Sequence, residues 1–134
     1  MFVPDFKLFT MKLTKAEEQI MQILWELKEA MVRDIRDKFN DPKPARNTVS
    51  TIIRVLESKG IVGYRESGNA HVYYPLVSKR EYSKKQLFSL MNDYFGNSFP
   101  QMATFFAKEK DLSIEDLEQL LIETKEELQK PDNE

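Results

Sequence analysis

The sequence of 134 residues predicts a mostly α-helical fold with one small β-hairpin. Three observations support this fold class. Apolar residues recur at helical spacing in six separate segments. Between residues 61 and 75 the pattern changes to two short runs of β-branched and aromatic residues. The length allows one domain, or one small domain with an appendage, and the 41% of hydrophobic residues is enough to build a core.

The first predicted helix begins at a capping-box sequence. Thr14 is a good N-cap residue, and Glu17 stands three positions later. The apolar stripe that follows predicts the face that enters the core, and it consists of Ala16, Ile20, Ile23, Leu24 and Leu27. Trp25 lies off this stripe. We expect it to pack on a neighbouring element, because its side chain is a large apolar anchor.

The second and third predicted helices are separated by a turn. The second covers about residues 32–39, with Val32, Ile35 and Phe39 on one side. Residues 40–44 read Asn-Asp-Pro-Lys-Pro, which is a turn sequence. The third helix lies between Pro44 and Gly60, and the glycine is a candidate C-terminal stop. Two helices, a turn and a further helix form a helix-turn-helix arrangement.

The third predicted helix has two faces of different chemistry. One is an apolar stripe of Val49, Ile52, Ile53 and Leu56. The opposite face holds short polar and cationic side chains, Asn47, Ser50, Thr51 and Arg54. Glu and Lys are more usual on a solvated face, whereas these side chains suit base edges and phosphates in a major groove. The pattern alone leaves both alternatives open, an ordinary surface helix or a DNA-reading helix.

A predicted β-hairpin follows the third helix. Its strands are residues 61–66 and 71–75, and residues 67–70, Ser-Gly-Asn-Ala, form the turn. Three helices followed by a hairpin make a winged helix, which we place at residues 12–77. Arg65, Asn69 and His71 lie at the wing and fit either a solvated strand or contact with a sugar-phosphate backbone. For His71 we favour a cross-strand or phosphate contact over metal ligation, because no partner ligand is nearby in sequence.

Residues 78–134 predict three further helices. Ser78 and Glu81 form a second capping box, the fourth helix runs to about Phe95, and the sixth begins at Ser113. These helices hold more apolar surface than they can bury among themselves, which favours a twofold homodimer. The predicted dimer contacts are Leu87, Leu90, Met91, Tyr94, Phe95, Phe105, Phe106, Leu117, Leu120 and Leu121.

Charge is distributed unevenly along the chain. The net charge is −2, which disfavours non-specific coating of nucleic acid, but residues 43–80 hold seven Lys and Arg against two Glu. Such a local basic region is expected of a domain that touches DNA along one side. The predicted DNA contacts are Lys43, Arg46, Asn47, Thr48, Ser50, Thr51, Arg54, Arg65, Asn69 and His71.

Several classes of function are disfavoured by composition. The chain has no Cys and one His, so disulfides, zinc-thiolate sites and multi-histidine metal sites are not expected. It has no Gly-rich phosphate loop and no Ser/His/Asp set, so we predict no enzyme, no cofactor and no metal. The carboxylate pairs Glu17/Glu18 and Glu126/Glu127 are interpreted as solvated charge.

The sequence also indicates where in the cell the protein is located and what its first residues are. No run of about 18 apolar residues is present, so we expect no membrane insertion and a cytoplasmic protein. Residues 1–11 have neither the charge nor the apolar stretch of a signal peptide. We expect them to form an N-terminal extension, with Met11 as an alternative start.

Four segments together resemble the penicillinase-repressor (BlaI/MecI/CopY) family of bacterial transcription regulators. They are residues 13–25, residues 47–60, Tyr74-Pro75 at the strand end, and residues 106–113. The resemblance covers about residues 12–128. It implies a dimeric winged-helix repressor on a palindromic operator, with a helical dimerisation domain at residues 78–134. Genes of β-lactam-resistance or stress type are the targets that it implies.

Two branches of that family can be compared with this sequence. The copper-responsive branch has a Cys-rich C-terminal motif, and the absence of Cys here excludes that resemblance. In the β-lactam branch a membrane-bound sensor metalloprotease triggers cleavage of an Asn–Phe bond in the fifth helix. This bond aligns with Phe105–Phe106, where Phe106 matches and Phe105 replaces Asn. Another stress as inducer therefore stays open. The alternative function is a winged-helix protein-interaction module without operator-specific binding.

Overall fold

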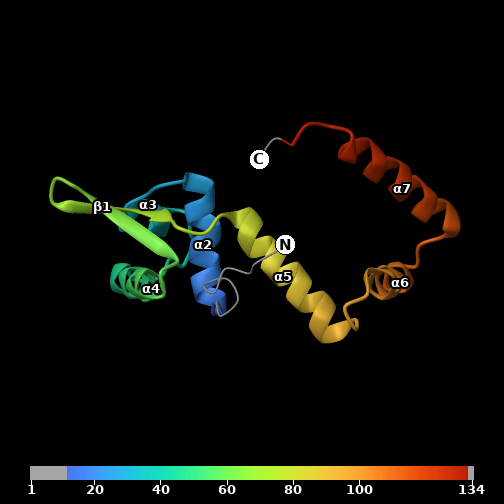
Figure 1. The fold of residues 1–134 in the computed structure, drawn as a ribbon. Coiled ribbons are helices and arrows are strands. Elements are labelled where there is room, and N and C mark those ends of the chain that lie inside the picture. The colour runs from blue at the N-terminus through green and yellow to red at the C-terminus, as the bar shows by residue number, and fades with distance from the viewer. Residues whose placement is uncertain (1–11, 133–134) are drawn as a thin grey trace. The chain divides into compact units, whose positions relative to one another are not determined.

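The computed structural model describes residues 12–132, so the predicted extension at residues 1–11 lies outside the described part. The described chain is mostly helical with one antiparallel hairpin, which confirms the predicted fold class (Figure 1). In order, its elements are α2 (Lys15–Leu27), α3 (Val32–Asp37), α4 (Arg46–Ser58), β1 (Val62–Ser67), β2 (Ala70–Pro75), α5 (Lys79–Tyr94), α6 (Phe99–Glu109) and α7 (Ile114–Leu128).

The chain divides into two compact units. The N-terminal unit ends at Gln86 and the C-terminal unit begins at Leu87, so the helix α5 contributes residues to both. The N-terminal unit contains the three helices α2 to α4, the hairpin and the first half of α5. This order of helices and hairpin is a winged helix-turn-helix.

The capping box predicted at the start of α2 is present. The Thr14 hydroxyl accepts a hydrogen bond from the Glu17 N–H at 3.1 Å, and Glu17 Oε1 accepts one from the Thr14 N–H at 2.8 Å. The predicted apolar stripe needs one correction. Ala16 was predicted to face the core and is exposed, whereas Met21 was not predicted to do so and is fully buried. A second core-facing row on α2 was therefore missed, because this helix is covered on more than one side.

The end of α4 explains the role of Gly60. This glycine has a φ of 77°, which the absence of a Cβ permits. The Gly60 N–H donates to the Glu57 carbonyl at 2.9 Å, and the Ile61 N–H donates to the Leu56 carbonyl at 3.0 Å. These two bonds form a Schellman motif, which satisfies the last carbonyls of the helix. The predicted stop is confirmed, and the chain leaves α4 directly into the hairpin.

The hairpin is short and regular. Its register runs from Val62↔Pro75 to Ser67↔Ala70, and the turn consists of Gly68 and Asn69. Gly68 has a φ of 64°, as the first central residue of a type II′ turn requires. Ala30, between α2 and α3, exchanges two backbone hydrogen bonds with Tyr73 at 2.8 and 2.9 Å. This bridge fixes the base of the wing to the helices.

One hydrophobic core holds the N-terminal unit together. Its fully buried large side chains come from every helix of the unit before α5, and they include Ile20, Met21, Leu24, Ile35, Val49, Ile53 and Leu56. Each such side chain contributes about 1.5–3 kcal/mol on removal from water. The core also fixes which side of α4 faces inward, since three of its apolar residues have no exposed surface.

The first turns of α5 also belong to this unit. Trp25 Nε1 donates to the Val77 carbonyl at 2.8 Å, and its ring lies 5.6 Å from that of Tyr82. The Tyr82 hydroxyl donates to Glu18 Oε2 at 2.7 Å. The expectation that Trp25 packs on a neighbouring element is therefore confirmed. Burial and the Glu18 carboxylate raise the pKa of Tyr82, so it stays a hydrogen-bond donor at neutral pH.

The C-terminal unit contains the second half of α5 with α6 and α7. Ser98 caps α6, and Ser113 with Asp116 forms the capping box of α7 at 2.9 and 3.0 Å. Phe95 and Phe105 pack with ring centroids 5.4 Å apart. Neither α6 nor α7 contains a buried residue. Within residues 12–132, every helix is too short or too polar to span a lipid bilayer.

Candidate nucleic-acid interface

The α4 helix presents a polar row of six side chains, in its first turn and along the side opposite the core. Arg46, Asn47, Thr48, Thr51 and Arg54 are exposed, and Ser50 is half-buried. Behind them, the side chains that pack into the core hold the backbone of the helix in place. The Thr51 hydroxyl donates to the Asn47 carbonyl at 2.8 Å, so its oxygen lone pairs remain available as acceptors. The structure thus brings six of the predicted DNA contacts onto one helix.

The turn before α4 is braced by two cations. Arg36 Nε donates to the Pro44 carbonyl at 2.8 Å. Lys43 Nζ donates to the carbonyls of Phe39 and Asp37 at 2.6 and 2.9 Å. Lys43 was predicted to contact DNA, and here its ammonium satisfies carbonyls at the end of α3. It keeps one donor for a phosphate, since an ammonium has three.

The wing residues do not form one cluster. Side chains of neighbouring residues on a strand point to opposite faces. Arg65 is therefore on one face of the hairpin, and His71, which is paired with Glu66, is on the other. The Arg65 guanidinium lies 2.9 Å from the Glu29 carboxylate, with both side chains more than half exposed. Asn69 is exposed at the turn.

His71 belongs to a small aromatic group. Its ring is stacked on that of Tyr64, with centroids 4.4 Å apart and planes 16° from parallel. Its Nδ1 lies 3.5 Å from the Tyr73 hydroxyl. Its Nε2 lies 3.9 Å from the Glu66 carboxylate. The contacts with Tyr64 and Glu66 cross from one strand to the other, which was one of the two expected roles of this residue. Tyr64, which the sequence did not single out, is the exposed ring that holds His71 in place.

Glu17 requires a correction, because the sequence suggested a solvated carboxylate. Only 4% of the residue is exposed, and Lys59 Nζ lies 2.8 and 2.9 Å from its two oxygens. Burial raises the pKa of Glu17, but hydrogen bonds from Lys59 and Thr14 outweigh that effect and the net pKa is lowered. Glu17 is therefore charged at neutral pH. The Glu126/Glu127 pair is exposed, as expected of solvated charge.

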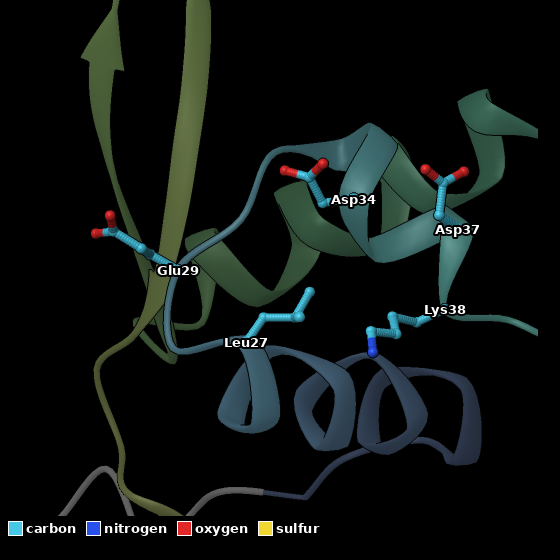
Figure 2. Close-up of a pocket in the computed structure, with 5 residues that line it drawn as sticks. All are labelled: Leu27, Glu29, Asp34, Asp37 and Lys38. Atoms are coloured by element: carbon cyan, nitrogen blue, oxygen red, sulfur yellow. The ribbon is translucent and has the colours of Figure 1, made fainter.

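A hollow beside α2 and α3 is lined by Leu27, Glu29, Asp34, Asp37 and Lys38. Figure 2 shows the carboxylates of Asp34 and Asp37 on α3 extending away from Leu27. Glu29 pairs with Arg65, and Lys38 pairs with Glu26 at 3.2 Å. The polar groups do not converge on one point. Among residues 12–132, no three or more His, Cys, Asp or Glu side chains gather as metal ligands would.

The predicted dimer contacts lie mainly on open surface. Met91 and Phe95 are half-buried, and the others, Leu87, Leu90, Tyr94, Phe105, Phe106, Leu117, Leu120 and Leu121, are exposed. Ile114 is also exposed, three residues before Leu117 on the same face of α7, and helical spacing alone would have identified it. Phe105 and Phe106 lie inside α6, with more than half of each residue exposed.

Comparisons with known proteins show the family of this chain. Residues 13–126 match the penicillinase repressor family. The methicillin resistance regulatory protein MecI of Staphylococcus aureus strain N315 is 26% identical over 112 residues, which cover 83% of this chain and 91% of the relative. The penicillinase repressor of Staphylococcus aureus is 24% identical over 110 residues, covering 81% and 87%. A solved structure of a Lactococcus lactis ZitR mutant has a TM-score of 0.46 at 16% identity, covering 90% of this chain and 78% of that chain. The chain belongs to the penicillinase repressor family of DNA-binding transcriptional repressors.

Proposed function

We propose that this repressor binds a palindromic operator as a homodimer, with the polar row of α4 in the major groove. The observation that supports this most is the exposed row of Asn, Ser, Thr and Arg on a helix whose other side is fixed in the core. Arginine pairs with guanine and asparagine with adenine through two hydrogen bonds each. Arg54 and Asn47 are therefore the proposed base readers, while Arg46, Thr48, Ser50 and Thr51 add base and phosphate contacts.

The wing is the second proposed contact. Asn69 at the hairpin turn and His71 on one face would meet the sugar-phosphate backbone beside the groove. Arg65 would do so after exchanging the exposed Glu29 carboxylate for a phosphate. An exposed ion pair is worth about 0–1 kcal/mol, so this exchange has a low cost. Lys43 contributes through its remaining donor.

Dimerisation is supported by the lack of a core in the C-terminal helices. Exposed side chains on α5, α6 and α7 would become buried against a second copy of the chain. Twofold symmetry then places two α4 helices on the two halves of a palindrome, one or more helical turns of DNA apart. Binding at the promoter of its own gene, or of β-lactam-resistance or stress-type genes, would occlude transcription in the cytoplasm.

Release of the operator would follow proteolysis at Phe105–Phe106, triggered by a membrane-bound sensor metalloprotease. Cleavage there would separate α7, with Leu117, Leu120 and Leu121, from the rest of the chain. A protease would reach this bond after local unwinding of α6, which is favoured by a helix without buried side chains. A monomer on a half-site has half the phosphate contacts, so its affinity falls steeply.

A gel shift with the DNA upstream of its own gene tests the operator proposal. We expect one retarded complex that survives excess non-specific competitor and weakens as salt is raised. A shuffled sequence of the same length and base composition is the control. Equal binding to both sequences, or no binding at low salt, would contradict operator recognition and favour the protein-interaction module.

A further inference from the structure

Two sets of contacts hold the two ends of α4 to the other helices of the unit. Before the helix, Arg36 donates to the Pro44 carbonyl at 2.8 Å. At the other end, Lys59 is the C-cap residue, and its ammonium binds both carboxylate oxygens of Glu17. Each contact connects α4 to a different helix of the unit, α3 at the start and α2 at the end.

The Glu17–Lys59 contact has the features of a fixed joint rather than of a surface ion pair. The Glu17 side chain is 5% exposed, whereas the carboxylates of the other pairs between separate elements are more than half exposed. Glu17 Oε1 also accepts the Thr14 N–H at 2.8 Å. The capping box therefore fixes the Glu17 carboxylate at the start of α2, and Lys59 binds a carboxylate whose position is already set. The ammonium also lies at the C-terminus of α4, where positive charge is favoured.

We propose that Glu17 and Lys59 are positioning residues that set the axial position and rotation of α4 for reading base edges. Lys59 in this role does not contact DNA, although it lies in the basic segment of the sequence. The idea rests on the proposed operator binding. The proposal adds a fixed position of α4 as a second requirement for operator binding. Base readout depends on side-chain placement, whereas phosphate contacts tolerate small shifts.

Charge changes separate positioning from electrostatic attraction. Lys59→Met removes a positive charge, and Glu17→Gln removes a negative one while preserving an acceptor for the capping box. Attraction to phosphates predicts opposite effects, with weaker binding for Lys59→Met and tighter binding for Glu17→Gln. Positioning predicts that both substitutions weaken operator binding. We expect a loss of about tenfold or more in each, comparable with one mismatched base pair.

The experiment measures the affinity of the full chain for the DNA upstream of its gene and for shuffled DNA, across a range of salt concentrations. Circular dichroism at the assay temperature shows that each variant is folded. We expect both variants to lose operator affinity with an unchanged salt slope. Lys59→Arg, which keeps a charged donor for the carboxylate, should recover most of it. Lys38→Met is the matched control, because Lys38 pairs with the exposed Glu26 and not with a residue joined to α4.

Three results would overturn the proposal. In the first, Lys59→Met reduces the slope of log affinity against log salt concentration by about 0.9, as expected for one lost phosphate contact, and Glu17→Gln binds more tightly. Lys59 would then be a phosphate contact. Wild-type affinity in both variants would show that the joint does not position α4. Equal binding of the wild type to operator and shuffled DNA would contradict the proposed function itself, and positioning with it.

Discussion

The two units of this repressor differ in how far their apolar side chains are buried within one chain. In the N-terminal unit, apolar side chains from three helices and the hairpin meet in one core and are shielded from water. In the C-terminal unit, no residue of α6 or α7 is buried, and most of their large apolar side chains are exposed. The first unit therefore has what it needs to fold by itself. The second has half of a core, which a second chain completes in the proposed dimer.

The largest expected effect tests the self-sufficient unit. Leu56→Ala removes a fully buried side chain on the inner face of α4. We expect a loss of about 2–5 kcal/mol in the free energy of unfolding, from lost burial and the cavity left behind. Urea unfolding followed by circular dichroism measures it. Leu128→Ala is the control at a position that is 79% exposed, and a similar loss there would contradict the contrast in burial.

A charge on the open surface tests the incomplete unit. Phe106→Asp would place a carboxylate in the proposed dimer interface at a residue that is 52% exposed in one chain. We expect dimer dissociation to become easier by about 2 kcal/mol or more. The melting of the N-terminal unit should change little. Sedimentation equilibrium measures the first effect. A wild-type chain that is already monomeric at micromolar concentration would contradict the proposed dimer.

A substitution on the polar row of α4 tests function without touching either core. Arg54→Ala should weaken operator binding by about 1–3 kcal/mol and relax specificity at one base position. Fluorescence anisotropy with operator variants measures both. Arg33→Ala, an exposed cation on α3, is the matched control. Equal losses for the two variants would assign Arg54 a general electrostatic role.

The smallest expected effect is on the free energy of unfolding at acid pH. The folded-state pKa of Glu17 is lowered below its usual value of 4.5, so its contribution to stability is present above that pH. This contribution to the free energy of unfolding is lost as the pH falls through the folded-state pKa, because both states then bind the proton. Glu17→Gln should lack this part of the decline. Urea unfolding at a series of pH values compares the two chains. Parallel pH curves would contradict the ionised pair.

Local signals predicted most of the architecture. Thr14 with Glu17, Ser113 with Asp116, and Gly60 each mark a helix end by a hydrogen-bond pattern that spans a few residues. Such patterns are visible in the sequence because their partners are near in the chain. The change of periodicity after Gly60 likewise placed the hairpin.

The missed features depend on partners that are distant in sequence. Glu17 was interpreted as solvated because Lys59 is 42 residues away. The partner of Arg65 is 36 residues away, so its pairing with Glu29 was equally invisible. Met21 was missed because the sequence could not show how many sides of α2 are covered. The DNA contacts, the domain limits and the dimer contacts remain predictions.

The single tryptophan gives this protein a built-in optical probe. Trp25 donates to the Val77 carbonyl and packs near Tyr82, at the point where α5 begins. All of the indole emission therefore comes from this one junction. A rearrangement of α5 on operator binding or after cleavage would shift that emission without any label. Stopped-flow fluorescence of the unmodified chain could then time repression and its release.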